Sequence, residues 1–290
     1  MNISLPESDH IINPDGSVYH LKLKPGEVAR KIITVGDPER VDQVARYFDL
    51  IELTRQNREF KTITGWLDDQ RLSVISTGIG TDNIDIVMTE LDSLFNIDFS
   101  SRLPKSNITP LQFFRLGTSG SIHDDVEMDT CLVSGHAYGL DSLADFYPSN
   151  SGLNSIENDI KMPQFKSYLT KADDELLKYF IPFFKVGITL TIPGFYHPQG
   201  RLTRIENPRV LEVRQLFNRS TALGKITNME METSGIYLLA EYYGHQAISL
   251  NAILANRLHQ TYTSHPEKTI AKMISQSIEI ILTIPDVDIS

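Results

Sequence analysis

Residues 31–45, "KIITVGDPERVDQVA", decide the fold class, because they join a predicted strand directly to a predicted helix. The apolar run at the start is typical of a buried strand, and it stops at Gly36. Asp37 suits a helix N-cap, and Pro38 suits the first helical turn. The apolar residues that follow share one helical face: Val41, Val44, Ala45 and Phe48. The segment therefore predicts one β–α unit.

The alternation of strands and helices continues along the chain. Apolar, β-rich runs predict further strands at 71–78, 111–120, 131–135, 184–192 and 247–255. Helical periodicity predicts an amphipathic helix over 84–95, capped by Thr81 or Asp82, and a C-terminal helix over 270–281 that closes the core. This alternation is typical of an α/β domain with a largely buried sheet.

The sequence predicts one domain, because no internal repeat, low-complexity segment or long linker divides it. We expect the domain over residues 18–290, preceded by an N-terminal extension over residues 1–17. The polar stretches 99–110 and 147–159 are expected to be additions on the surface of the domain.

Composition excludes several classes of protein. The 290 residues include 27 basic and 37 acidic side chains, and the net charge of −10 argues against a broad nucleic-acid-binding surface. Cys131 is the single cysteine, which excludes an intramolecular disulfide and a multi-cysteine zinc site; we expect it to be buried and unreactive. The histidines show no metal-binding spacing, and no metal is expected. The sequence has no signal-peptide pattern and no apolar run near the roughly 18 residues that span a bilayer. A cytoplasmic protein without membrane or nucleic-acid partners is expected.

Two arginines indicate a local anion site. Arg40 lies in the first turn of the predicted helix after Gly36, where a cation opposes the helix dipole unless an anion binds. Arg115, in "RLGTSG" (115–120), interrupts an apolar strand, and burying it is costly without a charged partner. An ordinary helix start is the alternative for the first motif, and neither motif matches a P-loop or a dinucleotide fingerprint. Arg58, in "NREF", is uninformative on its own.

The segment "GFYHPQGR" (194–201) follows an apolar run and permits two interpretations. Its glycines and proline predict a turn. Alternatively, Gln199 and Arg201 jointly bind a flat, polar ligand that stacks near Phe195. The local sequence is compatible with both.

A series of motifs occurs in order between residues 18 and 280: "GDPER", "NREF", "STGIG", "RLGTSGSI", "FYHPQGR", "NMEMET" and "NRL". Together they resemble the nucleoside phosphorylase family, and in particular its uridine phosphorylases. The resemblance implies a single α/β domain built on a mixed, partly barrel-like central sheet flanked by helices. It also implies reversible phosphorolysis of uridine to uracil and ribose 1-phosphate, a reaction of pyrimidine salvage and catabolism. Inorganic phosphate is then a co-substrate, and no cofactor is implied.

The resemblance implies a role for individual residues. The implied phosphate-binding residues are Gly36, Arg40, Arg115 and Thr118, with Arg58 supplied by a neighbouring subunit. The implied ribose-binding residues are Thr118, Glu230, Met231 and Glu232, with His20 supplied by the neighbour. The implied base-binding residues are Ser119, Gly120, Phe195, Gln199, Arg201 and Arg257. The implied catalytic residues, which position phosphate and offset the charge that develops on ribose, are Arg40, Arg115 and Glu232.

The segment "LANRL" (254–258) favours a pyrimidine substrate. Purine-specific relatives resemble one another in having an Asp in this segment, which protonates the base. Here the candidates are Asn256 and Arg257, and neither delivers a proton at neutral pH. The retained phosphate-binding arginines argue against nucleosidases, which use water. The alternatives are a purine nucleoside phosphorylase and a non-catalytic nucleoside-binding protein of the same fold.

The expected assembly is a homodimer with shared active sites. The 99–110 segment makes the chain similar to the longer, dimeric members of the family, and a trimer of dimers is the alternative. Glu59 would suit a monovalent cation at the subunit interface, but the loop "GTDN" (80–83) departs from the family pattern and leaves this open. The choice between uridine, deoxyuridine and thymidine is also open.

Overall fold

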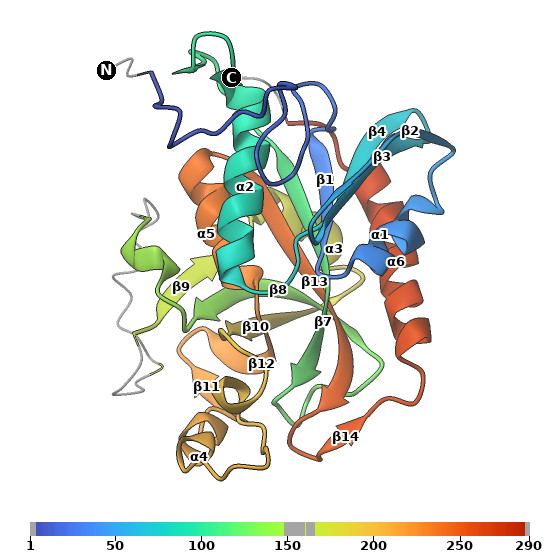
Figure 1. The fold of residues 1–290 in the computed structure, drawn as a ribbon. Helices are drawn as coiled ribbons and strands as arrows, with labels where there is room; N and C mark the ends of the chain where they lie inside the picture. The colour runs from blue at the N-terminus through green and yellow to red at the C-terminus, as the bar shows by residue number, and fades with distance from the viewer. Residues whose placement is uncertain (1–3, 148–159, 161–165, 288–290) are drawn as a thin grey trace.

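The computed structural model describes residues 4–147, 160 and 166–287, and it is built around one large mixed sheet (Figure 1). The strands on its main path are β1 (Lys31–Val35), β2 (Leu50–Asn57), β3 (Phe60–Leu67), β4 (Gln70–Ser76), β7 (Gln112–Ser121), β8 (Cys131–Gly139), β10 (Lys185–Thr191), β11 (Ser220–Thr221), β12 (Gly224–Glu230) and β13 (Gln246–Asn256). Their spatial order is β11-β12-β10-β8-β13-β7-β1-β4-β3-β2. Outside this path, β9 (Tyr168–Lys171) pairs with β8, and β14 (Thr261–Tyr262) pairs with β13.

Part of the sheet closes into a barrel. Strand β12 pairs in parallel with β10 and also antiparallel with β7, where Asn228 lies opposite Ser121 and Met229 opposite Gly120. Strands β12, β10, β8, β13 and β7 therefore form a closed ring. Strands β1 and β13 run parallel to β7 on either side, so their carboxyl ends meet at one end of the ring. The predicted mixed, partly barrel-like sheet is confirmed.

Helices cover the outside of the sheet. They are α1 (Pro38–Ala45), α2 (Thr81–Asn96), α3 (Asp174–Phe180), α4 (Arg209–Arg214), α5 (Thr233–Tyr243) and α6 (Pro266–Thr283). Helices α2 and α5 pack together on one flank, and α1 and α6 lie on the other (Figure 1). Each fully buried apolar side chain on such a helix contributes about 1.5–3 kcal/mol. Among the described residues, no helix combines the length and the apolar character needed to cross a bilayer.

The predicted elements occur where the sequence pattern indicated them, with one correction at a helix cap. Asp37 caps α1 as expected, because its carboxylate accepts a hydrogen bond from the backbone N–H of Glu39 at 2.9 Å. Helix α2, however, is preceded by Gly80, which has φ 96°, and no side chain caps the helix. Neither Thr81 nor Asp82 is the cap, because the chain enters this helix through a conformation that favours glycine.

The predicted surface additions are only partly visible. Segment 99–110 contains β6 (Leu103–Pro104), which pairs with β5 (Ile97–Asp98). The N-terminal segment packs on it: the Leu5 N–H donates to the Arg102 carbonyl, and the Arg102 guanidinium donates to the His10 carbonyl at 2.6 Å. Residues 148–159 of the other addition lie outside the described residues. The domain boundary at residue 17 stays a prediction.

Gly65 of β3 lies where β2 and Phe48, in the turn between α1 and β2, leave no room for a side chain. An added Cβ would lie 2.4 Å from the Leu50 carbonyl oxygen and 2.6 Å from Cδ2 of Phe48. We expect Gly65→Ala to lower the free energy of unfolding by up to about 3 kcal/mol, measured by urea denaturation. Gly244→Ala is the control: with φ 77° and no atom within 4 Å of the new Cβ, it should cost only about 1 kcal/mol for the left-handed backbone. Equal losses would contradict the packing described here.

Candidate active site

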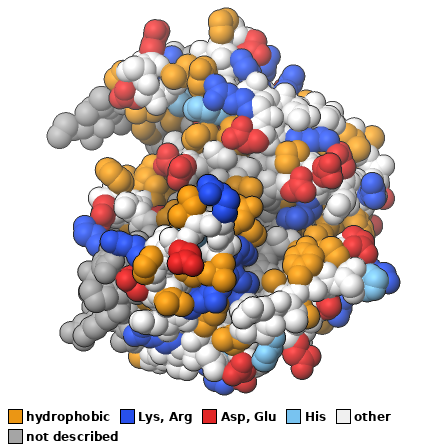
Figure 2. Space-filling model, turned by 60° about the horizontal axis from the view of Figure 1, so that its bottom comes forward, with side chains coloured by type: hydrophobic (Ala, Val, Ile, Leu, Met, Phe, Trp, Pro, Cys, Tyr) orange, Lys and Arg blue, Asp and Glu red, His pale blue; other side chains and the backbone are white. Residues whose placement is uncertain are grey.

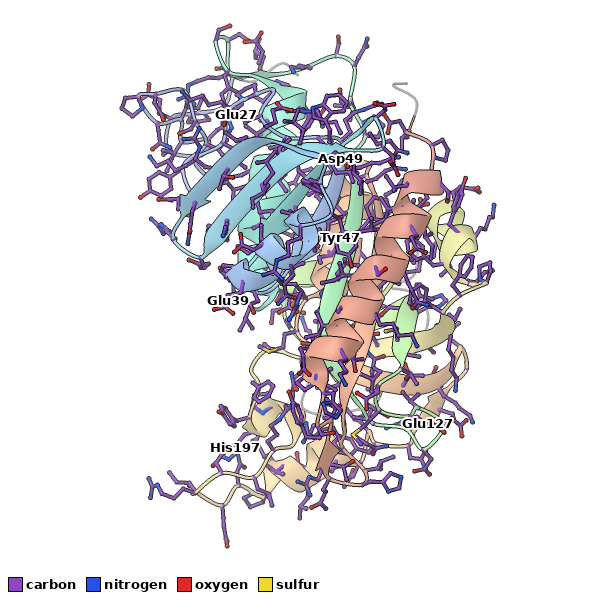
Figure 3. The ribbon with its side chains drawn as sticks, turned by 90° about the vertical axis from the view of Figure 1, so that its right-hand side faces the viewer. Glu27, Glu39, Tyr47, Asp49, Glu127 and His197 are labelled. Carbon is purple, nitrogen blue, oxygen red and sulfur yellow. The ribbon has the colours of Figure 1, made fainter. Side chains whose placement is uncertain are left out.

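A cavity of about 670 Å³ opens at the end of the ring where the carboxyl ends of β1, β7 and β13 meet. Its walls come from segments distant in sequence: 36–40, 115–120, 195–201, 229–232 and 254–257. Figure 2 brings this end of the molecule forward and shows a hollow with Lys and Arg side chains on its walls. In Figure 3 the start of α1, marked by Glu39, and the turn that holds His197 lie on opposite sides of this cavity. A second cavity of about 660 Å³, near the end of α6, is lined by none of the predicted site residues.

The cavity brings together all but two of the predicted site residues. The predicted residues that line it are Gly36, Arg40, Arg115, Thr118, Ser119, Gly120, Phe195, Gln199, Arg201, Glu230, Met231, Glu232 and Arg257. His20 and Arg58, which the resemblance assigns to a neighbouring subunit, do not line the cavity of their own chain. The predicted roles of these residues stay predictions.

Arg115 of β7 is the buried charge at the centre of the site. It is 5% exposed, and its Nη2 lies 2.8 Å from Oε2 of Glu230 and 2.7 Å from Oε2 of Glu232. Its Nη1 donates to Oδ1 of Asn251 at 3.1 Å and to the Ser249 hydroxyl at 3.3 Å. Burial disfavours the charged guanidinium, but the two carboxylates outweigh this effect and raise the pKa of Arg115 above its ordinary value.

The two carboxylates reach Arg115 from different elements. Glu230 ends β12, and its carboxylate accepts hydrogen bonds from the Thr191 hydroxyl at 2.6 Å and from backbone N–H groups at the start of α5. Glu232 lies beyond the strand, at the N-cap of α5, and accepts from the Gly80 N–H at 2.8 Å. Both carboxylates are buried. Burial raises the pKa of Glu232.

Arg40 lies beside this cluster with weak protein acceptors. Its Nη1 donates to the Leu116 carbonyl at 3.4 Å, and the described residues give it no salt bridge within 4 Å. Burial, with the nearby positive charge of Arg115 as a smaller cause, lowers the pKa of Arg40. The Arg40 guanidinium, which has no carboxylate partner among the described residues, therefore favours an anion in the cavity. We call Arg40, Arg115, Glu230 and Glu232 the carboxylate end of the cavity.

The opposite end of the cavity is built on the turn in "GFYHPQGR". Gly194 and Gly200 have φ 93° and 71°, so the turn interpretation is confirmed. The turn buries Gln199 to 2% exposure, and Arg201 donates to its Oε1 at 2.5 Å. The Arg201 guanidinium lies 3.5 Å from the centre of the Phe195 ring. A cation, an amide and an aromatic ring thus form one surface.

Arg257 completes this arginine-rich end, which we define as Gln199, Arg201 and Arg257. Its Nη2 donates to the Gln199 carbonyl at 3.2 Å, and its buried Nη1 has no hydrogen-bond partner in the described part of the chain. Burial and the charge of Arg257 lower the pKa of Arg201 to about 10. Asn256 does not line the cavity; its Oδ1 accepts from the backbone N–H groups that follow it. Among the described residues that line the cavity, acids occur only at positions 37, 230 and 232.

His20 and Arg58 lie near each other on the surface. The Asn57 amide donates to the His20 carbonyl at 2.7 Å, and the Arg58 guanidinium lies 5.5 Å from the centre of the Tyr19 ring. His20 Nδ1 pairs with Glu90 at 2.6 Å. The ring is therefore oriented, while Nε2 is left without a protein partner in any contact described.

Sequence reasoning missed residues that support or line the site. Ser249 and Asn251 hold Arg115 from β13, and Ile79 and Tyr262 are exposed side chains on the cavity wall. The signal for Ser249 and Asn251 was present: polar residues two apart in an apolar strand face the same side. Cys131, which was expected to be buried, is only partly buried, and burial raises the pKa of its thiol to about 11.

Comparison with known proteins decides the family. The model of the phosphorylase superfamily matches residues 30–284. The chain belongs to the phosphorylase superfamily. It is 28% identical over 273 residues to a uridine phosphorylase of Thermococcus kodakarensis, covering 92% of this chain and 87% of that protein. It is 26% identical over 269 residues to a DeoD-type purine nucleoside phosphorylase of Caldanaerobacter subterraneus, covering 90% and 98%.

A solved structure shares the fold across nearly the whole chain. A nucleoside phosphorylase of Trypanosoma brucei with uridine phosphorylase activity is 26% identical to this chain, with a TM-score of 0.78, and covers 95% of this chain and 100% of its own. The predicted family and fold are confirmed. The chain is an enzyme of the nucleoside phosphorylase type, a pentosyltransferase that acts on a nucleoside and phosphate.

Gly117 gives Arg115 the space that it occupies. A Cβ on Gly117 would lie 2.0 Å from Nη1 of Arg115, so Gly117→Ala must displace the guanidinium. We expect kcat/KM for phosphorolysis to fall by about 100-fold, the usual effect of a shift of about 1 Å at a reacting site. The control is Gly120→Ala, whose Cβ would lie 3.1 Å from Cγ of the flexible Arg257 and should cost less. A Gly117→Ala enzyme with full activity would refute this account of Arg115.

Proposed function

We propose that this protein is a uridine phosphorylase, which converts uridine and inorganic phosphate reversibly to uracil and ribose 1-phosphate in pyrimidine salvage and catabolism. The observation that carries the proposal is the arginine-rich end of the cavity. There, Gln199, Arg201 and Arg257 line the cavity, and no described acid lines this end. The uridine phosphorylases among the relatives support the same substrate.

The arrangement of polar groups suits the edge of uracil. Uracil offers acceptor, donor and acceptor in a row: O2, N3–H and O4. The Gln199 amide supplies a donor and an acceptor, and Arg201 supplies further donors beside it. Cytosine has an amine in place of O4, and this amine would face the donors of Arg201. The same edge therefore disfavours cytidine.

Charge at this end also suits the leaving group. When the bond between ribose and base breaks, negative charge spreads onto O2 and O4 of uracil. Arg201 and Arg257 stabilise that charge because no carboxylate among the described residues neutralises them. A purine that leaves with a proton on N7 needs an acid, and none of the described residues places one here. The DeoD-type relatives keep purine nucleoside phosphorolysis as the second candidate function.

The carboxylate end suits phosphate and ribose. Arg40 and Arg115 provide positive charge for phosphate, and Thr118 provides a hydroxyl between them and the base. Glu232 accepts hydrogen bonds from the ribose hydroxyls and offsets the positive charge that develops on the sugar. Phosphate held beneath C1′ is then both the nucleophile and the counter-charge. Phosphate is the co-substrate, and the proposal requires no cofactor.

The charge balance of one chain supports a shared site. Arg40 and Arg115 are matched by Glu230 and Glu232, so one chain leaves the charge of phosphate uncompensated. Arg58 is exposed outside its own cavity, with His20 beside it. We therefore propose a homodimer in which Arg58 binds the partner's phosphate and His20 binds the partner's ribose.

A panel of nucleosides tests the reaction. The purified protein should release uracil from uridine only when phosphate is present, with kcat/KM at least about 100-fold above that for cytidine or inosine, because mismatched hydrogen-bonding groups are strongly rejected. Release of base is followed by absorbance or chromatography. Uracil release without phosphate would contradict a phosphorylase, faster inosine cleavage would favour the purine alternative, and binding without turnover would favour the non-catalytic one.

Mixed oligomers test the shared site. Arg58→Ala and Arg115→Ala should each abolish most activity, because each removes a phosphate ligand. After the two variants are unfolded and refolded together, activity should return to about one quarter of the wild-type value, since half of randomly paired dimers are mixed and each has one complete site. Refolding each variant alone is the control. No recovery would mean that each site is built within one chain.

A further inference from the structure

A chain of hydrogen bonds crosses the inside of the barrel from Arg115 to Ser119. The residues between them are at most 1% exposed and do not line the cavity: Asn251, Ser134, Thr189 and Asn228. They come from β13, β8, β10 and β12, so the chain visits every strand of the closed ring and begins and ends on β7. Behind the cavity wall, it joins Arg115 of the carboxylate end to Ser119, which also lines the cavity.

The first half of the chain starts at a cation. Arg115 Nη1 donates to Oδ1 of Asn251 at 3.1 Å, and Nδ2 of Asn251 donates to the Ser134 hydroxyl at 2.9 Å. The hydroxyls of Ser134 and Thr189 lie 2.5 Å apart.

The second half fixes the direction of the bond between Ser134 and Thr189, in which either hydroxyl could be the donor. Thr189 donates its single hydroxyl proton to Oδ1 of Asn228 at 3.0 Å, so Ser134 must be the donor to Thr189. Nδ2 of Asn228 then donates to the Ser119 hydroxyl oxygen at 3.0 Å. All donors therefore point from Arg115 towards Ser119. Since the Ser119 oxygen is an acceptor in the chain, its own proton is directed away from Asn228, and Ser119 lines the cavity.

We propose that this chain holds the Ser119 hydroxyl as a hydrogen-bond donor to a carbonyl oxygen of the leaving base, and that Asn251, Ser134, Thr189 and Asn228 are positioning residues. The inference rests on the proposed uridine phosphorylase function and adds a specificity element to it. In a chain of aligned hydrogen bonds each donor polarises the next, so the last donor is strengthened. The Ser119 hydroxyl then favours a base that has a carbonyl oxygen within its reach. Its hydrogen bond is strongest when the leaving base carries negative charge.

The leaving base distinguishes this role from simple support of the barrel. 5-Fluorouracil leaves more readily than uracil because its anion is more stable. If the chain strengthens a donor to the leaving base, breaking it slows uridine more than 5-fluorouridine. If the chain only supports the barrel, breaking it slows both substrates by the same factor.

Substitutions at Thr189 provide the test. Thr189→Val keeps the shape and removes the hydroxyl, and we expect kcat for uridine to fall by about tenfold, the value of one hydrogen bond of about 1.4 kcal/mol. The ratio of kcat for 5-fluorouridine to kcat for uridine should rise at least about threefold, because the lost hydrogen bond raises the barrier for uridine more. Thr189→Ser keeps the hydroxyl and should restore both values.

Two further variants complete the design. Ser134→Ala removes the hydrogen bond between Ser134 and Thr189. If Thr189→Val does not fold, the kcat ratio of the two substrates is measured in Ser134→Ala instead. Ser73→Ala is the matched control, because Ser73 is equally buried and does not line the cavity. Its hydroxyl accepts from the Ala29 N–H at 2.8 Å and forms a hydrogen bond with the Thr64 hydroxyl at 2.7 Å. This control variant should alter the thermal midpoint without altering the ratio.

The outcomes separate the inference from the proposed function. An unchanged substrate ratio in Thr189→Val and Ser134→Ala, or a Thr189→Ser enzyme as slow as Thr189→Val, would overturn the role of the chain while leaving a uridine phosphorylase. A wild-type enzyme that does not cleave uridine would overturn the proposed function itself, and this inference with it.

Discussion

The buried ion cluster of Arg115 with Glu230 and Glu232 is the interaction on which the site depends. A lone guanidinium inside a barrel would cost several kcal/mol, and removal of one partner from such a cluster typically costs about 3–5 kcal/mol. Glu230 is in turn held by the start of α5, and Glu232 by the backbone at Gly80. Strand β7, strand β12, helix α5 and the loop before α2 are therefore fixed relative to one another by one positive charge.

The two ends of the cavity differ in how their charges are balanced, and this difference explains the chemistry. At the carboxylate end, protein acids already neutralise Arg115, so the arginine is oriented before any ligand arrives. At the arginine-rich end, Arg201 and Arg257 keep their charge. Carboxylates near the ribose and unpaired arginines near the base stabilise a transition state in which the sugar becomes positive and the base negative. Fixed charges need no reorganisation at the moment of bond cleavage.

Much of the fold was readable from the sequence, because strand and helix periodicities are local. The β–α unit at residues 31–45 and its Asp37 cap are visible in the side chains themselves. The start of α2 was not visible in this way, because Gly80 precedes the helix with a positive φ and no polar side chain caps it. Strand β2 was also missed, because its largely exposed side chains give no apolar alternation.

Most of the residues that line the cavity were predictable as a set, but their contacts were not. Arg115 and Glu232 lie far apart in sequence, and only closure of the ring brings them to 2.7 Å. The role of Asn251 was hidden for the same reason, because a polar residue in an apolar strand does not reveal its partner. Resemblance to a family names residues one at a time, whereas charge balance is a property of the cluster.

Closure of the barrel also governs when the site can form during folding. The ring needs β13, which ends at Asn256 and pairs with both β7 and β8. Contacts between such distant segments form late and slowly, because long loops must close first. During synthesis, a chain that has not yet reached residue 246 contains Arg115 but lacks β13, which supplies Ser249 and Asn251 as its neutral acceptors. The active site is therefore a late product of folding, and until β13 pairs the edges of β7 and β8 stay open to aggregation.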